Sequence, residues 1–271
     1  MKIAASITPN KTKFGPLLFP GEVERGCKYL HEVGYDAIEL SLRTKDDIDA
    51  KTLNRILSTN HLDLVAIATG QSYIEDDFSL YNGDNVLRDN SIKRICAHID
   101  LAAEFNAGVI IGGIRGVVKR KEYFSIYKDL GEQALCTCAE YAQIKKVTLL
   151  LEPVNRYETN IINTVADAQD VINRNSLQSV VKILPDAYHM NIEEQDLPAT
   201  LLKNRDSIGA FHCSDSNRLA PGLGHIDFKT LLAQLKTSTE CRYLGVEILP
   251  LPSSEEAAFS AIQTIKTALQ N

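Results

Sequence analysis

Four residues with metal-binding side chains stand in corresponding positions of the second half of the sequence. These residues are Glu152, Asp186, His212 and Glu247. Consecutive members are separated by 26 to 35 positions, about the length of one strand, one crossover helix and their connections. Three carboxylates and one imidazole gathered at one place would form a site for a hard divalent cation.

Each of the four residues follows a short run of continuous apolar residues. The runs are Val147 to Leu151, Val180 to Leu184, Ile208 to Phe211 and Tyr243 to Val246. Continuous apolarity predicts strands that are buried on both faces, as in a parallel sheet. The carboxyl ends of such strands meet at one edge, so the four side chains are expected to converge. A single strand-end carboxylate is often a helix cap or an ion-pair partner, but four in corresponding positions favour a metal site.

Strand-like and helix-like segments alternate along the whole chain, which predicts an all-parallel α/β fold. The expected strands are Ile3 to Thr8, Ala37 to Leu40, Leu64 to Thr69, Val109 to Ile114, Val147 to Glu152, Val180 to Asp186, Ile208 to His212 and Leu244 to Leu249. The expected helices are Gly21 to Val33, Asp46 to Ser58, Asp84 to Phe105, Lys121 to Lys145, Thr164 to Arg174, Ile192 to Lys203, Phe228 to Lys236 and Ser254 to Leu269. Eight strands close a barrel, so we predict a single (β/α)8 TIM barrel over residues 1–271. A doubly wound sheet would need a glycine-rich turn after the first strand, and Thr8-Pro-Asn-Lys-Thr12 is not one.

Composition narrows the cellular setting and the partners. The 271 residues are 44% hydrophobic, and no linker-like stretch divides them. No apolar run is long enough to cross a membrane, and Met1-Lys2 leads directly into a strand without a secretory leader. Six cysteines without a CxxC pair indicate reduced thiols, so we expect a cytoplasmic protein. The net charge of −6 and pI near 5.6 argue against a nucleic-acid partner.

The oxygen-rich ligand set favours particular metals. Carboxylates with one imidazole suit manganese, magnesium or cobalt better than a cysteine-rich zinc site would. We expect one divalent metal ion, with Mn²⁺ preferred and Mg²⁺, Co²⁺ or Zn²⁺ as alternatives. Side chains alternate in direction along a strand, so if His212 points into the barrel, Cys213 points outward and is not a ligand.

A second set of polar residues follows the same strands. Glu158 comes six residues after Glu152, His189 three after Asp186, and Arg218 six after His212. Each lies in a loop that leaves a ligand-bearing strand, and such loops hold substrate in barrels. Donors and acceptors in this pattern suit a polyhydroxylated ligand, although His189 could be a packed histidine and Arg218 a structural ion-pair partner.

Several sequence blocks resemble the xylose-isomerase-like sugar isomerase/epimerase family of barrels, over essentially the whole chain. The blocks are Glu152-Pro-Val-Asn-Arg-Tyr-Glu-Thr159, Asp186-Ala-Tyr-His-Met-Asn-Ile-Glu-Glu194, Phe211-His-Cys-Ser-Asp-Ser-Asn-Arg218 with Pro221-Gly-Leu-Gly224, and Glu247-Ile-Leu-Pro250. Within the family the chain resembles ketose 3-epimerases acting on D-tagatose or D-psicose. It is more similar still to 5-keto-L-gluconate epimerases, through Thr69-Gly-Gln-Ser-Tyr73 and Val109-Ile-Ile-Gly-Gly-Ile-Arg-Gly116.

The resemblance implies a divalent-metal-dependent epimerase or isomerase. In that family a ketone and a neighbouring hydroxyl bind the metal, which makes the adjacent C–H more acidic. Glu152 and Glu247 would then remove and return a proton through a metal-bound enediolate. The resemblance also implies metal ligation by the four residues of the first set, sugar binding by Glu158, His189 and Arg218, and a homo-oligomer, dimer or tetramer.

Substrate class is suggested by residues outside these sets. Free-ketose epimerases commonly cover the sugar with tryptophan, and this chain has none. Arg115, at the end of the fourth strand, could bind a substrate carboxylate bidentately or pair with a neighbouring acid. Gln71 and Tyr73 could line the pocket or cap the next loop. We expect a keto-sugar acid first, an unphosphorylated ketose second, and a sugar phosphate third.

Two other classes of protein share this fold. Endonucleases that cut at abasic sites need a cluster of metals and therefore many more His, Asp and Glu ligands. The chain has six histidines, and His31, His61 and His98 fall in helical or helix-flanking segments where solvated positions are expected. A non-catalytic sugar-binding barrel would not require carboxylates at both Glu152 and Glu247.

Overall fold

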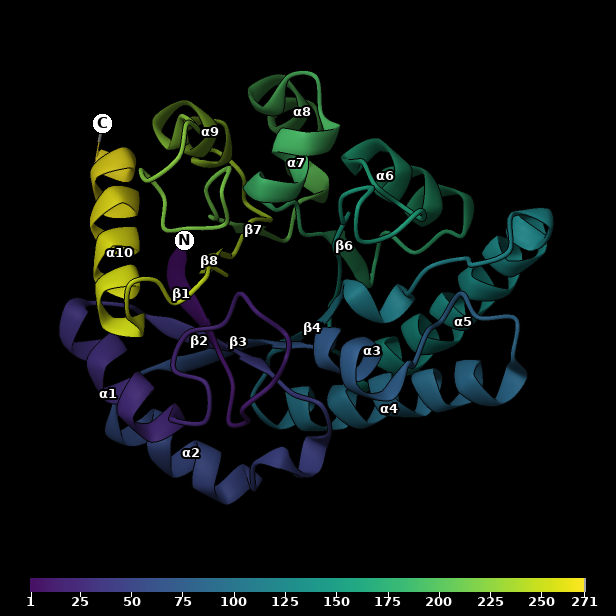
Figure 1. Ribbon diagram of the computed structural model, residues 1–271, viewed down its shortest axis with the longest axis horizontal. Helices are drawn as coiled ribbons and strands as arrows, with labels where there is room; N and C mark the ends of the chain where they lie inside the picture. The colour runs from purple at the N-terminus through teal and green to yellow at the C-terminus, as the bar shows by residue number, and fades with distance from the viewer. Residues whose placement is uncertain (271) are drawn as a thin grey trace.

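A computed structural model describes residues 1–270 and shows eight parallel strands surrounded by helices (Figure 1). The strands are β1 Lys2–Ile7, β2 Ala37–Ser41, β3 Asp63–Ala68, β4 Gly108–Ile111, β5 Leu149–Leu151, β6 Val181–Ile183, β7 Ala210–His212 and β8 Tyr243–Val246. Their order in the sheet is β6-β5-β4-β3-β2-β1-β8-β7. The predicted (β/α)8 barrel is therefore confirmed, with every expected strand present.

Two isolated bridges close the barrel between β6 and β7. These bridges join Ile183 to Ile208 and Asp186 to His212, whereas every other neighbouring pair of strands is joined by a ladder of three or more paired residues. Two backbone hydrogen bonds support this junction: Gly209 N donates to Ile183 O at 2.9 Å, and His212 N donates to Pro185 O at 2.9 Å. The β6–β7 junction is thus the least hydrogen-bonded joint of the barrel.

Helices connect the strands and cover the outside of the barrel (Figure 1). They are α1 Val23–Val33, α2 Ala50–Thr59, α3 Gly70–Asp76, α4 Asn85–Glu104, α5 Phe124–Lys145, α6 Val165–Arg174, α7 Ala187–Glu193, α8 Leu197–Asn204, α9 Phe228–Leu235 and α10 Ser254–Gln270. Short 3-10 turns are η1 Lys45–Asp47, η2 Gly113–Arg115, η3 Lys121–Tyr123 and η4 Arg205–Ser207. Among residues 1–270, no helix combines the length and apolarity that crossing a membrane requires.

Some predicted boundaries were wrong, and local capping explains them. The helix expected over 46–58 begins at Ala50, because the Asp49 side chain accepts a hydrogen bond from Thr52 N and starts a new helix there. The strand expected over 109–114 ends at Ile111, and η2 follows it. The single helix expected over 192–203 is two helices, since the Asp186 and Asp196 side chains each cap a separate start.

The core has two layers, as in other closed barrels. Apolar residues that face outward from the strands, such as Ile38 and Val109, pack against the helices. Inward-facing residues form a smaller cluster of mainly small side chains with Leu150, Leu184 and Tyr243. Cys213 is fully buried in the outer layer, in agreement with its expected direction.

The predicted solvent exposure of one histidine was wrong. His98 is fully buried in α4 rather than solvated, whereas His31 and His61 are exposed as expected. Neither ring nitrogen of His98 has a hydrogen-bond partner among the described residues. Burial lowers the pKa of His98 to about 3, so the ring is neutral and packs as a core side chain.

Candidate metal centre

The structure brings the four predicted ligands together at the carboxyl ends of β5 to β8. One ligand atom from each of Glu152, Asp186, His212 and Glu247 lies within 4.8 Å of all the others. All four residues are buried, with at most 7% exposure. His212 ends β7, and the other three residues follow β5, β6 and β8 directly or within three positions.

Unpaired polar atoms inside this group fit a cation. The buried atoms Glu152 Oε1 and His212 Nδ1 have no hydrogen-bond partner among the described residues. His212 Nδ1 lies 3.5 Å from Asp186 Oδ2 and 3.7 Å from both Glu152 Oε1 and Glu247 Oε2. Buried polar atoms are normally satisfied, and one divalent ion between these atoms would satisfy them together.

A glycine on the neighbouring strand makes room for Glu152. A Cβ atom on Gly112, which follows β4, would lie only 2.1 Å from Glu152 Oε2. The φ angle of Gly112 is −107°, so space rather than backbone conformation requires glycine here. The Glu152 carboxylate therefore occupies volume that any other residue at position 112 would fill.

Arg218 bridges two of the carboxylates. Its Nη1 donates to Asp186 Oδ2 and its Nη2 donates to Glu247 Oε2, and its guanidinium carbon lies 4.8 Å from the Tyr188 ring centroid. The backbone of Arg218 has φ 64°, a left-handed conformation that costs about 1 kcal/mol or more for a residue with a Cβ atom. Such strain is found at sites where the side chain must be held in one place.

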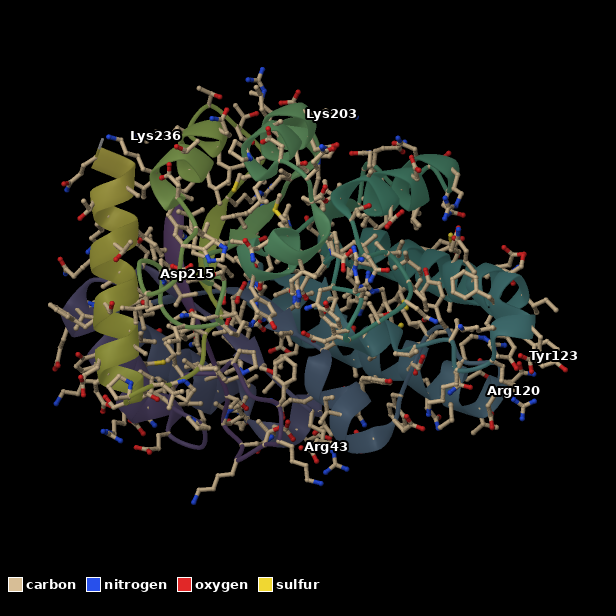
Figure 2. All side chains as sticks on the ribbon, turned by 45° about the horizontal axis from the view of Figure 1, so that its top comes forward. Arg43, Arg120, Tyr123, Lys203, Asp215 and Lys236 are labelled. Atoms are coloured by element: carbon tan, nitrogen blue, oxygen red, sulfur yellow. The ribbon has the colours of Figure 1, made fainter. Side chains whose placement is uncertain are left out.

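The loop that carries Arg218 is organised by Asp215, which the sequence analysis did not single out. Asp215 is fully buried and accepts hydrogen bonds from the backbone N–H groups of Ser216, Gly222 and Ile226 at 2.7, 2.7 and 3.2 Å. Burial alone would raise the pKa of Asp215, but these bonds lower it. Figure 2 shows Asp215 in this loop, beside α10.

Electrostatics differ between the two carboxylates that Arg218 contacts. Burial opposes ionisation of Asp186, yet Arg218 and His212 together bring its pKa far below the usual range. For Glu247, burial dominates and raises the pKa to about 8, although Arg218 and His212 partly offset it. Glu152 and Asp186 also raise the pKa of Glu247, so the three carboxylates repel one another, and a divalent cation among them would relieve this repulsion.

Glu39 is a further site residue that the sequence analysis missed. It lies in β2, is 1% exposed, and faces His212 Nε2 with its two oxygens at 2.9 and 3.1 Å. Ser6 Oγ donates to the same carboxylate. Burial alone would lower the pKa of His212, but Glu39 and the other nearby carboxylates raise it well above its usual value. Glu39 thus fixes the ring so that Nδ1 faces the three carboxylates, and an acidic residue within the apolar run Ala37 to Ser41 was the available signal.

We expect Glu39→Gln to weaken divalent-metal binding about 10- to 100-fold, because a carboxylate behind a ligating histidine orients the ring and makes it a better donor. The measurement is the Mn²⁺ dissociation constant by calorimetry at fixed pH. Ser6→Ala is the control, since it removes one hydrogen bond to Glu39 and keeps the charge. A lower melting temperature with an unchanged dissociation constant would show that Glu39 stabilises the fold and does not affect metal binding.

The expected substrate-binding residues take different positions around the centre. His189 is 3% exposed; its Nε2 lies 3.9 Å from Glu152 Oε1, and its Nδ1 lies 2.7 Å from Asn155 Nδ2. Burial lowers the pKa of His189, although Asp186 opposes the effect. The Glu158 side chain is 54% exposed, and its Oε1 accepts from Asn155 Nδ2 at 3.0 Å. Asn155, which the sequence analysis left aside, links these two residues.

Gln71 and Arg115 are both 1% exposed but differ in their contacts. Gln71 Nε2 donates to Thr8 Oγ1 at 2.9 Å and to Ser41 O and Oγ at 3.0 Å, so its amide nitrogen ties together the ends of β1 and β2. Arg115 Nε donates to Gly112 O at 3.2 Å, whereas its Nη1 and Nη2 have no partner among the described residues. Tyr73 lies in α3, a helix that the sequence analysis did not predict.

Fold and site together define a parallel eight-stranded barrel with a candidate divalent-metal centre at the carboxyl ends of its strands. A family model described as xylose isomerase-like TIM barrel matches residues 27–267. The chain belongs to this family. That membership confirms the resemblance seen in the sequence blocks.

Characterised relatives are sugar epimerases. A 3-dehydro-D-guloside 4-epimerase of Escherichia coli K12 is 28% identical over 244 residues, which cover 84% of this chain and 88% of that protein. An L-ribulose 3-epimerase of Mesorhizobium japonicum is 29% identical over 217 residues, covering 79% and 71% of the two chains. A solved structure of an L-ribulose 3-epimerase superposes with a TM-score of 0.82 at 22% identity, covering 99% of this chain and 96% of that one, and supports the fold.

Proposed function

We propose that this protein is a divalent-metal-dependent epimerase of a keto-sugar or keto-sugar acid. The observation that carries the proposal is the pair of buried carboxylates, Glu152 and Glu247, in one four-residue candidate metal centre. They follow β5 and β8, which β6 and β7 separate around the barrel. Two carboxylates that approach one substrate from different strands are what inversion at a single carbon requires, because one must remove a proton and the other must return one to the opposite face.

The chemistry then follows from the residue types. A divalent ion bound by the four residues would polarise a substrate carbonyl and make the adjacent C–H more acidic. Glu152 and Glu247 would exchange the proton on either face of the resulting planar enediolate. Arg218 would hold Asp186 and Glu247 in place, and His189 would donate to or accept from a substrate hydroxyl. Glu158, which is more exposed, would bind a sugar hydroxyl at the outer side of the site.

Several features of the chain support a sugar substrate and this class of metal. The relatives named above act on a dehydro-sugar and on a ketose, both of which have a C–H next to a carbonyl. Ligand type favours Mn²⁺, with Mg²⁺, Co²⁺ or Zn²⁺ as alternatives. An aldose–ketose isomerase would share the same enediolate and is the alternative within this class. A multi-metal nuclease would need additional ligands, and the described residues provide one such group with four members.

Proton NMR in heavy water tests the proposal directly. The Mn²⁺- or Mg²⁺-loaded protein would be incubated with a panel of neutral ketoses and keto-sugar acids, and the metal removed before spectra are recorded. We expect deuterium at one carbon of at least one substrate, together with its epimer. Deuterium incorporation with an aldose product would indicate the isomerase instead. No exchange with any member, combined with cleavage of an abasic duplex, would contradict the proposal.

Arg115 supports an acidic substrate in particular. A fully buried guanidinium without a counter-charge is costly, and burial lowers the pKa of Arg115 to about 10. Among charged groups, Tyr81 and Glu152 oppose this shift most, but no described residue forms an ion pair with Arg115. A substrate carboxylate would pair with the free Nη1 and Nη2 atoms and remove this cost, so we propose Arg115 as the residue that selects keto-sugar acids.

We expect Arg115→Gln to raise KM for a keto-sugar acid at least about tenfold, because a charged hydrogen bond is lost. Turnover of a neutral ketose should change by less than about threefold. Steady-state kinetics on a matched acid and neutral pair would measure the difference. Arg115→Lys is the control, because it keeps the charge but loses the planar guanidinium. Its KM for the keto-sugar acid should lie between the values for the unmodified protein and for Arg115→Gln. Equal losses on both substrates would show that Arg115 acts only in the fold.

A further inference from the structure

A cavity of about 330 Å³ lies at the opposite end of the barrel from the metal centre. Its wall is formed by residues at or just before the amino ends of strands, including Lys2 of β1, Asp63 of β3 and Gly108 of β4. The four candidate metal ligands lie at the carboxyl ends, so the two sites are separated by the length of the strands. The volume is within the range of small-molecule sites.

Positive charge predominates around this cavity. Its charged lining residues are Lys2, Lys146, Lys182, Arg242, Asp63 and Glu240. Lys2 pairs with Asp63, and Lys182 Nζ lies 2.7 Å from Glu240 Oε2. Lys146 and Arg242 have no ion-pair partner among residues 1–270. Arg242 is nevertheless close enough to Glu240 to lower the pKa of Glu240, as Lys182 also does. The four basic and two acidic lining residues thus give the cavity a net positive charge, although the whole chain carries a net charge of −6.

One of these lysines faces the inside of the barrel. Lys182 lies in β6 between Val181 and Ile183, which both pack in the outer core, so alternation directs Lys182 inward. Gly209 makes this possible, because a Cβ atom there would lie 2.7 Å from Lys182 Cβ. The Lys182 side chain is only 26% exposed. A lysine that points into the barrel needs an anion close by, and Glu240 at the rim of the cavity provides one.

The inner wall of the cavity is closed and partly polar. Leu150 and Tyr243 are 4% and 3% exposed and belong to the inward-facing cluster. They line the inner end of the cavity, on the side toward the carboxyl ends of the strands. Half-buried Thr148, just before β5, adds a hydroxyl to the lining. A ligand here would therefore meet cations at the rim, a hydroxyl on one side and an apolar surface at its inner end.

We propose that this cavity binds a small phosphate monoester. A phosphoryl group carries about −1.5 to −2 charges at neutral pH, which complements the net positive charge of the lining. Lys146 and Arg242 would bind the phosphoryl oxygens, and the remaining volume would hold the esterified part of the molecule. The site is independent of the proposed epimerase reaction, because none of its lining residues belongs to the metal centre.

Calorimetric titration with inorganic phosphate and with glycerol phosphate tests the proposal on the metal-loaded protein. We expect saturable binding that weakens with added salt, and tighter binding of the ester than of free phosphate. Lys146→Gln combined with Arg242→Gln should weaken binding of the ester at least about tenfold. Tighter binding of inorganic phosphate than of the ester would overturn the assignment of a monoester site.

A matched pair at the other end of the barrel is the control. Lys119→Gln combined with Arg120→Gln removes the same two kinds of charge from the segment between η2 and η3, and Arg120 lies at the outer edge of the molecule in Figure 2. Binding should stay within about twofold of the unmodified protein. The proposal fails if no binding saturates, or if the two double variants lose affinity equally. The melting temperature of each single variant would show whether unfolding causes a loss of affinity.

Discussion

The Glu152→Gln and Glu247→Gln variants are each expected to lose about 10²- to 10⁴-fold in kcat at saturating metal, the usual contribution of a positioned proton-transfer group. Both side chains are buried within the four-residue group, so a neutral amide of the same shape removes the base and keeps the packing. Sugar binding should remain substantial, because neither substitution removes Arg218 or His189. Steady-state kinetics and equilibrium sugar titration would measure the two effects separately.

Isotope exchange distinguishes two bases from one. If each carboxylate serves one face, Glu152→Gln should stop deuterium exchange into one epimer and leave exchange into the other, and Glu247→Gln should show the opposite pattern. Glu104→Gln, at an exposed position of α4, controls for the loss of a carboxylate. The two-base mechanism is wrong if both variants exchange the same epimer or if either keeps full activity.

Metal removal is expected to have the second large effect. Polarisation of a carbonyl by a bound ion contributes several kcal/mol, which corresponds to about a thousandfold or more in rate. Activity should disappear after chelation and return with Mn²⁺. At a metal concentration 100-fold above Kd, binding should also stabilise the fold by about 2.7 kcal/mol, equivalent to a rise in melting temperature of roughly 5 to 10 °C.

Thermal unfolding with and without metal would measure this stabilisation. Asp186→Asn should reduce the metal-dependent rise in melting temperature, because Asp186 is fully buried in the ligand group. Asp206→Asn, whose side chain is 87% exposed in η4, should leave the rise unchanged. Full activity in chelator would contradict the assignment of these four residues as a metal centre.

Strand positions were predictable because burial on both faces gives continuous apolar runs that end abruptly. The metal-centre residues stand at those ends, so Asp186 and His212 could be brought together from spacing alone. Glu39 could be noticed as an acidic residue in an apolar run, but its partner His212 is 173 positions away, so the sequence of β2 does not show which residue Glu39 contacts.

Loop structure at the rim was the least predictable part. The α3 helix spans seven residues, too few for a clear helical periodicity, and the sequence analysis treated that segment as a loop. The division between α7 and α8 depends on two capping aspartates, one of which, Asp186, was interpreted only as a ligand. A single residue can therefore serve the helix and the site together, and sequence patterns show one role at a time.

The weakly hydrogen-bonded junction between β6 and β7 has a consequence for local opening of the barrel. Asp186 and His212 lie on its two sides and form one of the two bridges that close it. An ion that binds both side chains would cross-link the two edges at the place where backbone pairing is sparsest. Amide hydrogen exchange in β6 and β7 should therefore slow on metal binding much more than exchange in β1 and β2, whose ladder is continuous. Metal occupancy would set how often this barrel opens along its side.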